Sequence, residues 1–166
     1  DKLNKENGGD YGVIIVQPLA GGLVDKLNAQ DGRYSLYLRG LLKGEKVEET
    51  RIVDCVTRGI NPYTNTDEFF DCAKNPDLRF IVSNTTEAGI EYKPNQNPDD
   101  FNGLTFPGRL TLFMKKRFDE GLGGFILLPC ELIDKNGDNL KECILKYSED
   151  WGYGGEFEKW IETENH

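Results

Sequence analysis

Short apolar runs predict the strands of this chain. Residues 13–16, 80–82 and 125–128 are three such runs, each bounded by polar or turn-forming residues. Runs of this length that contain β-branched and aromatic residues are typical of parallel strands buried on both faces. Pro18 follows the first run and ends that strand, because proline cannot donate a hydrogen bond to a central ladder.

Apolar residues at helical spacing predict helices between and after these strands. One stripe predicts a core-facing helix and consists of Leu110, Phe113, Met114 and Phe118. Two later stripes predict helices near the C-terminus and consist of Leu140, Cys143, Ile144, Tyr147 and Trp151, and of Phe157, Trp160 and Ile161. Thr64 and Asp67 predict a capping box for a helix over residues 66–74. Residues 19–32 contain several glycines and predict a loop with one helical turn at most.

Two further β-rich stretches, residues 34–42 and 51–56, flank a turn at Gly44 and predict an antiparallel hairpin. Strands that alternate with helices predict an α/β fold with a mostly parallel sheet, to which this hairpin is added. A length of 166 residues is that of one domain with a substantial core.

The charge of the chain excludes two classes of partner. The formal net charge is −9, whereas duplex nucleic acid and anionic membranes bind basic surfaces. No apolar run approaches the roughly 20 residues of a membrane helix. We therefore expect neither nucleic acid nor membrane as a partner.

Cysteine and histidine usage bounds the chemistry. Cys55, Cys72, Cys130 and Cys143 lie far apart without a C-x-x-C pair, which indicates reduced thiols in a cytoplasmic protein. The single histidine is His166, whose terminal position predicts a disordered side chain. Histidine-based nucleophilic catalysis and histidine zinc sites are therefore not expected in this segment.

Polar side chains follow the second and third predicted strands where each strand ends. The first cluster consists of Ser83, Asn84, Thr85, Thr86 and Glu87, and the second of Cys130, Glu131 and Asn136. In open α/β sheets ligands bind at the carboxyl ends of the strands, so we expect both clusters to line one cleft. Hydroxyl and amide groups there suit the hydrogen bonds of a ribose or a nicotinamide carboxamide. The first cluster is equally explained by helix capping, and Cys130 by a buried small apolar residue.

Three stretches resemble known motifs but do not predict a phosphate, calcium or glycosylation site. Residues 121–124 (GLGG) precede a strand, whereas a phosphate loop follows a strand and opens a helix. Residues 134–138 contain acidic and amide side chains but lack the spacing of a calcium loop. Residues 84–86 form a glycosylation sequon at the end of a predicted buried strand. We expect no metal site.

Three longer stretches resemble the mannitol dehydrogenase family of long-chain polyol-specific dehydrogenases. They are QDGRYSLYLRGL at residues 30–41, SNTTEAGI at residues 83–90 and PCELIDKNGDNL at residues 129–140. The resemblance extends over nearly all of the chain with similar spacing, and the last two stretches are most similar to the uronate-reducing branch. It implies a Rossmann-type sheet flanked by helices, NAD as cofactor, and the interconversion of tagaturonate and altronate by hydride transfer in hexuronate catabolism.

The resemblance also implies roles for individual residues. Residues 83–87 and residues 130, 131 and 136 would lie beside the nicotinamide of NAD. Gln17 would bind the adenine ribose, at a position where the family usually carries an acidic residue. The catalytic lysine of the family lies in a later domain, so no catalytic residue is expected in residues 1–166.

The family's first strand and glycine-rich pyrophosphate turn have no match in this sequence. The resemblance therefore implies that residues 1–166 are an incomplete Rossmann-type NAD-binding domain, with that strand upstream and a helical substrate domain downstream. The expected partners are NAD, a small sugar acid and the rest of the chain. Two alternatives stay open: another reductase of the family, acting on fructuronate or mannitol, and a nucleotide-binding or regulatory module without catalytic activity.

Overall fold

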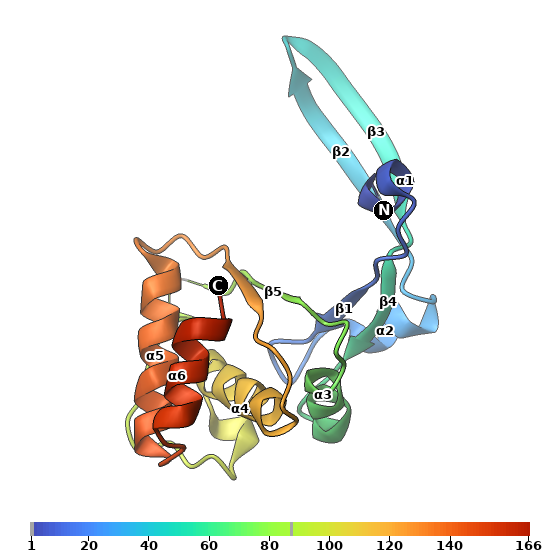
Figure 1. Ribbon diagram of the computed structural model, residues 1–166. Coiled ribbons are helices and arrows are strands. Elements are labelled where there is room, and N and C mark those ends of the chain that lie inside the picture. The colour runs from blue at the N-terminus through green and yellow to red at the C-terminus, as the bar shows by residue number, and fades with distance from the viewer. Residues whose placement is uncertain (1, 87) are drawn as a thin grey trace. The chain divides into compact units, whose positions relative to one another are not determined.

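The computed structural model describes residues 2–86 and 88–166 (Figure 1). The chain forms two compact units, Asp1–Phe69 and Phe70–His166. The elements of the first unit are α1 (Lys2–Asn7), β1 (Val13–Val16), α2 (Val24–Ala29), β2 (Tyr34–Leu42), β3 (Glu45–Val53) and β4 (Val56–Ile60). Helix α3 (Thr66–Ala73) crosses the boundary. The second unit continues with β5 (Phe80–Ser83), η1 (Phe101–Gly103), α4 (Phe106–Asp119), β6 (Ile126–Pro129), α5 (Asn136–Asp150) and α6 (Gly155–Glu164).

The predicted α/β class is confirmed. Strand β1 pairs with β4 and β5 pairs with β6, both in parallel, whereas β2 and β3 form the antiparallel hairpin. Within the described residues these strands are hydrogen-bonded as three two-stranded sheets and not as one continuous sheet. No helix in the described part of the chain is both long and apolar enough to cross a membrane.

In the first unit, the side-chain amide of Asn28 fastens α2 to β4. Its Nδ2 donates to the Gly59 carbonyl at 2.9 Å, and its Oδ1 accepts from the Gly59 N–H at 2.7 Å. These bonds take the place of a neighbouring strand for one residue of β4. The sequence predicted one helical turn at most over residues 19–32, but α2 spans Val24–Ala29. The glycines that suggested a loop lie outside this helix, Gly21 and Gly22 before it and Gly32 after it.

The hairpin is confirmed, but its predicted return strand is wrong. Strand β3 begins at Glu45, directly after the turn at Lys43 and Gly44, and ends at Val53 opposite Tyr34. The next strand, β4, pairs with β1 instead. Because most hairpin side chains are exposed, β3 carries charged residues and lacks the apolar run that predicts a buried strand.

Helix α3 begins with a different cap from the predicted one. The N–H of Glu68 donates to Oδ1 of Asn65 at 3.2 Å, and Nδ2 of Asn65 donates to Oε2 of Glu68 at 2.8 Å. This reciprocal pair is displaced by one residue from the predicted pair of Thr64 and Asp67. The hydroxyl of Thr64 instead donates to the Asn61 carbonyl at 3.3 Å.

The core of the second unit is built by the predicted stripes of α4, α5 and α6. Its most deeply buried large side chains include Met114, Phe125, Ile144, Tyr147 and Phe157. Phe125 stacks on Phe113 with ring centroids 5.6 Å apart. Full burial of an apolar side chain of this size contributes about 1.5–3 kcal/mol. Packing of these helices against the start of β6 is therefore a main source of stability in this unit.

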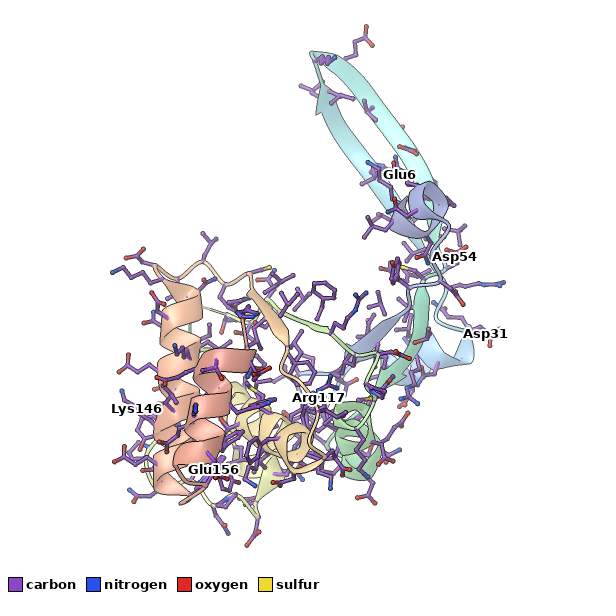
Figure 2. The ribbon with its side chains drawn as sticks, viewed as in Figure 1. Glu6, Asp31, Asp54, Arg117, Lys146 and Glu156 are labelled. Carbon is purple, nitrogen blue, oxygen red and sulfur yellow. The ribbon has the colours of Figure 1, made fainter. Side chains whose placement is uncertain are left out.

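Arg117, labelled in Figure 2, projects from α4 and is buried. Its guanidinium donates to the carbonyl of Gly123 at 2.8 Å and to the carbonyls of Ala73 and Asn75 at 3.2 and 2.6 Å. Burial lowers the pKa of this guanidinium below its ordinary value. The carbonyls satisfy a buried cation, and they tie the end of α3 to the segment that follows α4.

The C-terminal residue extends the second parallel pair. The N–H of His166 donates to the Phe125 carbonyl at 3.0 Å, and the Leu127 N–H donates to the His166 carbonyl at 2.6 Å. These two bonds hold the backbone of His166 against β6, and the predicted disorder of its side chain stays a prediction.

Predicted burial on both faces is also wrong for β5 and β6. Val82 is 65% exposed, and Phe80, Ile126 and Leu128 are exposed as well. In register, Phe80 lies opposite Ile126 and Val82 opposite Leu128, so these four side chains occupy one face. The buried face of this pair is the one that carries Ser83.

Gly124 gives a test of the packing at the C-terminus. A Cβ on Gly124 would lie 2.1 Å from the Glu164 carbonyl oxygen, whereas a Cβ on Gly123 would meet nothing within 4 Å. Because backbone cannot move aside cheaply, we expect Gly124→Ala to lower the free energy of unfolding by about 1–3 kcal/mol. The control Gly123→Ala should change it by no more than about 0.5 kcal/mol. Urea denaturation measures both, and equal losses would contradict this account of the packing.

Candidate functional site

The polar residues that follow β5 and β6 lie at one edge of the parallel pair. Ser83 lies opposite Pro129, and the N–H of Cys130 donates to the Ser83 carbonyl at 2.7 Å. Because the pair is parallel, the carboxyl ends of both strands lie at the same edge. The predicted position of the two strand ends at one edge is confirmed for the described residues. The cleft predicted to be shared by both clusters stays a prediction, because the cavity at this edge is lined by residues of the first cluster and by none of Cys130, Glu131 and Asn136. Glu87, which belongs to the first cluster, lies outside the described residues.

Glu131 joins the two strand ends. Its Oε1 accepts a hydrogen bond from the N–H of Thr85 at 3.0 Å and another from the Thr85 hydroxyl at 3.0 Å. The glutamate is only 4% exposed. A carboxylate that accepts two hydrogen bonds from one residue fixes both the backbone and the side chain of that residue.

The second carboxylate oxygen of Glu131, Oε2, is buried without a hydrogen-bond partner among the described residues. Burial raises the pKa of the Glu131 carboxyl, but hydrogen bonds from the Thr85 backbone, its own backbone and the hydroxyls of Ser83 and Thr85 outweigh burial and leave the pKa below its ordinary value. Glu131 is therefore a buried carboxylate that stays ionised at neutral pH.

A cavity of about 450 Å³ opens beside this contact, and it is lined by Asn84, Thr85, Thr86, Ala88 and Leu132. Asn84 and Thr86 are exposed on either side of the half-buried Thr85. The first three of these residues were predicted as site residues, whereas Ala88 and the 93% exposed Leu132 were not. An apolar residue that follows a buried glutamate in a loop gives no periodic signal of exposure.

Two other predicted residues of the second cluster have different surroundings. Nδ2 of Asn136 donates to the carbonyls of Pro129 and Glu131 at 2.6 and 3.1 Å, and its Oδ1 accepts from the Gly137 N–H at 2.8 Å. Asn136 therefore shapes the loop before α5, and its role in cofactor binding stays a prediction. Cys130 is exposed, so its interpretation as a buried small residue is wrong.

Gln17 lies in the first unit at the end of β1 and is 6% exposed. Its Nε2 donates to the carbonyls of Leu19 and Ala20 at 2.8 and 3.1 Å, and its Oε1 accepts from the Val24 N–H at 3.3 Å. The side chain thus holds the loop between β1 and α2 and supplies an acceptor to the first turn of α2. Its predicted contact with a ribose stays a prediction.

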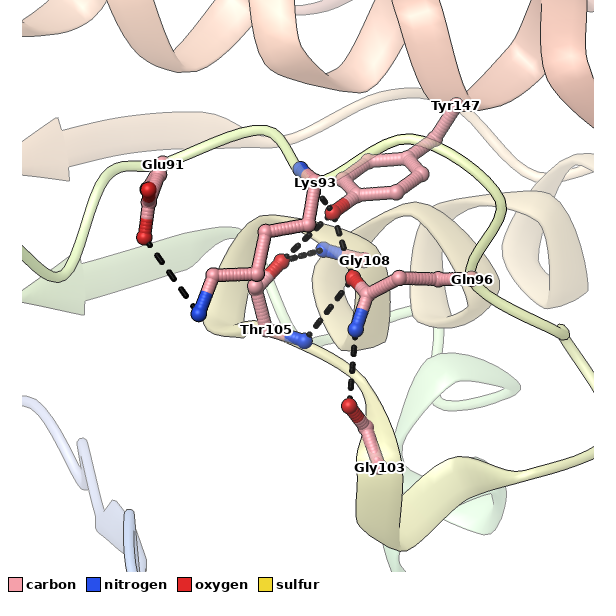
Figure 3. Close-up of polar contacts among 7 residues, drawn as sticks. All are labelled: Glu91, Lys93, Gln96, Gly103, Thr105, Gly108 and Tyr147. Carbon is pink, nitrogen blue, oxygen red and sulfur yellow. Dashed lines mark hydrogen bonds and ion pairs between the residues drawn. The ribbon is translucent and has the colours of Figure 1, made fainter.

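The long loop after the site is held by a buried tyrosine (Figure 3). The hydroxyl of Tyr147 donates to Oε1 of Gln96 at 2.5 Å, accepts from the Lys93 N–H at 3.0 Å and lies 2.8 Å from the Thr105 hydroxyl. Thr105 also caps α4 by accepting from the Gly108 N–H at 3.3 Å. One side chain of α5 therefore fixes both this loop and the start of α4.

The sequence is similar to known proteins over its whole length. The sequence model of the family described as "Mannitol dehydrogenase Rossmann domain" matches residues 3–166. Altronate oxidoreductase of Bacteroides thetaiotaomicron is 43% identical over 164 residues, which cover 96% of this chain and 34% of the relative. Altronate oxidoreductase of Cronobacter sakazakii is 41% identical over 170 residues, which cover 99% and 35%. The chain thus spans about a third of the length of these curated relatives.

Two solved structures share the fold. The ternary complex of Pseudomonas fluorescens mannitol 2-dehydrogenase with NAD and D-mannitol aligns with a TM-score of 0.81 at 18% identity, over 98% of this chain and 35% of the other. Substrate-free D-sorbitol dehydrogenase aligns with a TM-score of 0.77 at 19% identity, over 98% and 36%. At these identities the likeness establishes the Rossmann-type fold alone.

The Tyr147 network predicts the effect of removing one oxygen atom. We expect Tyr147→Phe to lower the free energy of unfolding by about 1–3 kcal/mol, because the part-buried hydrogen bonds of the Tyr147 hydroxyl to Gln96 and Lys93 are lost. Tyr37→Phe is the matched control, since Tyr37 is 65% exposed on the hairpin. Denaturant unfolding of both variants makes the comparison, and a Tyr147→Phe protein as stable as the control would rule out this role.

Proposed function

This chain belongs to the mannitol dehydrogenase family, and from this membership we propose that it is the dinucleotide-binding part of an NAD-dependent oxidoreductase that interconverts tagaturonate and altronate. The names of relatives that are about 40% identical favour this reaction over others in the family. The free thiols of all four cysteines favour a cytoplasmic enzyme.

The observation that carries the proposal is a cavity at the carboxyl edge of β5, lined by polar residues that Glu131, after β6, holds in place. Asn84 and Thr86 line the cavity at the carboxyl edge of β5 and β6. A ligand of an α/β sheet binds at this edge. An amide and a hydroxyl offer donors and acceptors for the carboxamide and ribose of a nicotinamide nucleotide, so the described residues fit that part of NAD.

The proposed division of labour follows from what these residues can do. Bound NAD would supply the hydride acceptor for the oxidation of altronate. Asn84 and Thr86 would orient the nicotinamide end by hydrogen bonds. We assign the pyrophosphate turn, the acid–base group and the sugar-acid site to the rest of the protein, because the curated relatives are about three times as long as this chain.

Cofactor choice is proposed to depend on the end of β1. An acidic side chain there repels the 2′-phosphate of NADP, whereas the amide of Gln17 is neutral and already bonds its own loop. We therefore assign the enzyme a preference for NADH with modest discrimination against NADPH.

Steady-state kinetics of the full-length protein test this function. We expect NADH oxidation to be fastest with tagaturonate, slower with fructuronate and slowest with fructose, and kcat/KM to be higher with NADH than with NADPH. Higher kcat/KM with fructose would place the protein in another branch of the family. A protein that binds NADH but reduces none of the three would instead be a binding or regulatory module.

Substitution of Asn84 tests the position of the cofactor. We expect Asn84→Ala to raise KM for NADH about 5- to 10-fold, which corresponds to one lost hydrogen bond of about 1 kcal/mol. Tyr37→Phe in the exposed hairpin serves as the control and should leave KM unchanged. If Asn84→Ala also leaves KM for NADH unchanged, the nicotinamide does not bind at this edge.

A further inference from the structure

The position of Thr85 depends on two other residues. The carboxylate of Glu131 binds it, and Gly89 leaves room for its side chain. Oε1 of Glu131 accepts hydrogen bonds from both the N–H and the hydroxyl of Thr85 at 3.0 Å. A Cβ on Gly89 would lie 1.9 Å from the Thr85 hydroxyl oxygen and 2.3 Å from its Cβ. The Gly89 N–H also closes a turn onto the Thr86 carbonyl at 2.7 Å.

We call the arrangement of Glu131, Thr85 and Gly89 the clamp. Its residues hold the neighbouring residues in place, and those neighbours can contact a ligand. The hydroxyl and N–H of Thr85 are used by Glu131, and the glutamate itself is buried. Asn84 and Thr86, which flank Thr85 in the chain, are exposed and line the cavity. Their positions therefore depend on a residue that the glutamate fixes.

We propose that Glu131 is a positioning residue that sets the affinity for NADH through Thr85, with Gly89 as the small residue that lets Thr85 reach it. This inference rests on the proposed function, since it takes the cavity to be the nicotinamide site. It assigns Glu131 no direct contact with the cofactor, because neither of its carboxylate oxygens is exposed at the cavity: Oε1 is bonded to Thr85, and Oε2 is buried.

Three substitutions in the full-length protein test the clamp. Glu131→Ala removes the acceptor, so we expect the Kd for NADH to rise about 10-fold or more, while kcat at saturating NADH changes less than about 3-fold. Glu131→Gln keeps an acceptor oxygen of the same reach, so its Kd should stay within about 3-fold of the unmodified protein. Gly89→Ala displaces Thr85 and should weaken NADH binding without touching the glutamate.

Amide hydrogen exchange at Thr85 gives a second readout that needs no cofactor. We expect exchange to become faster in Glu131→Ala and in Gly89→Ala but not in Glu131→Gln, because the N–H of Thr85 loses its acceptor only in the first two. Tyr147→Phe is the control for general destabilisation. It removes a buried hydrogen-bonding group of the same unit and should leave the Kd for NADH unchanged.

The outcomes separate this inference from the proposed function. If the unmodified protein does not bind NADH, the proposed function fails, and a Thr85 exchange rate that is unaltered in Glu131→Ala then overturns the clamp as well. If NADH binds and Glu131→Ala binds it as tightly as the unmodified protein, the inference is wrong. If Glu131→Gln binds as weakly as Glu131→Ala, the negative charge acts on the ligand, and the positioning role is overturned.

Discussion

One carboxylate oxygen at the end of β6 fixes the residue that follows β5. Glu131 and Thr85 are 46 positions apart in the sequence, and they meet only because β5 and β6 run parallel in a register that places Ser83 opposite Pro129. A shift of one residue would move every side chain of β5 to the other face. The candidate site thus depends on strand register, and register depends on the core that packs against β6.

The second unit uses its buried polar groups to hold loops. Arg117 binds three carbonyls that follow or end helices, and Tyr147 binds the loop between β5 and α4. Each group is hydrogen-bonded by neutral partners, which avoids unpaired donors in the interior. Glu131 differs, because one of its oxygens is buried without a partner among the described residues. Such an oxygen is a cost in stability that the hydrogen bonds to Thr85 offset.

Local pattern predicted much of this fold, and its failures have physical causes. Strands β1, β5 and β6 and helices α4, α5 and α6 were predicted because each carries an apolar run or stripe. The return strand of the hairpin was predicted at residues 51–56, which join the end of β3 to the start of β4. The rest of β3 was not predicted, because an exposed hairpin strand needs no apolar run. The meeting of the two strand ends followed from parallel topology. The engagement of Gln17 and Asn136 with their own loops could not be predicted, because an amide gives no sequence signal of which backbone groups it will bind.

Hydrogen-bond energies limit how much the exposed groups of Asn84 and Thr86, at the carboxyl edge of β5 and β6, can contribute to cofactor binding. One hydrogen bond adds about 0.5–1.5 kcal/mol, and association of a ligand costs an estimated 4–15 kcal/mol in lost translational and rotational freedom. The exposed groups of Asn84 and Thr86 therefore cannot hold a dinucleotide by themselves. Most of the affinity has to come from contacts to the pyrophosphate and adenosine, for which a helix N-terminus is the usual partner. The edge of β5 and β6 then adds a smaller share of the affinity, because a few well-placed hydrogen bonds can fix one ring position once the rest of the ligand is bound. A fixed Thr85 matters for this contribution because it sets the positions of Asn84 and Thr86, which make the contacts to the ligand.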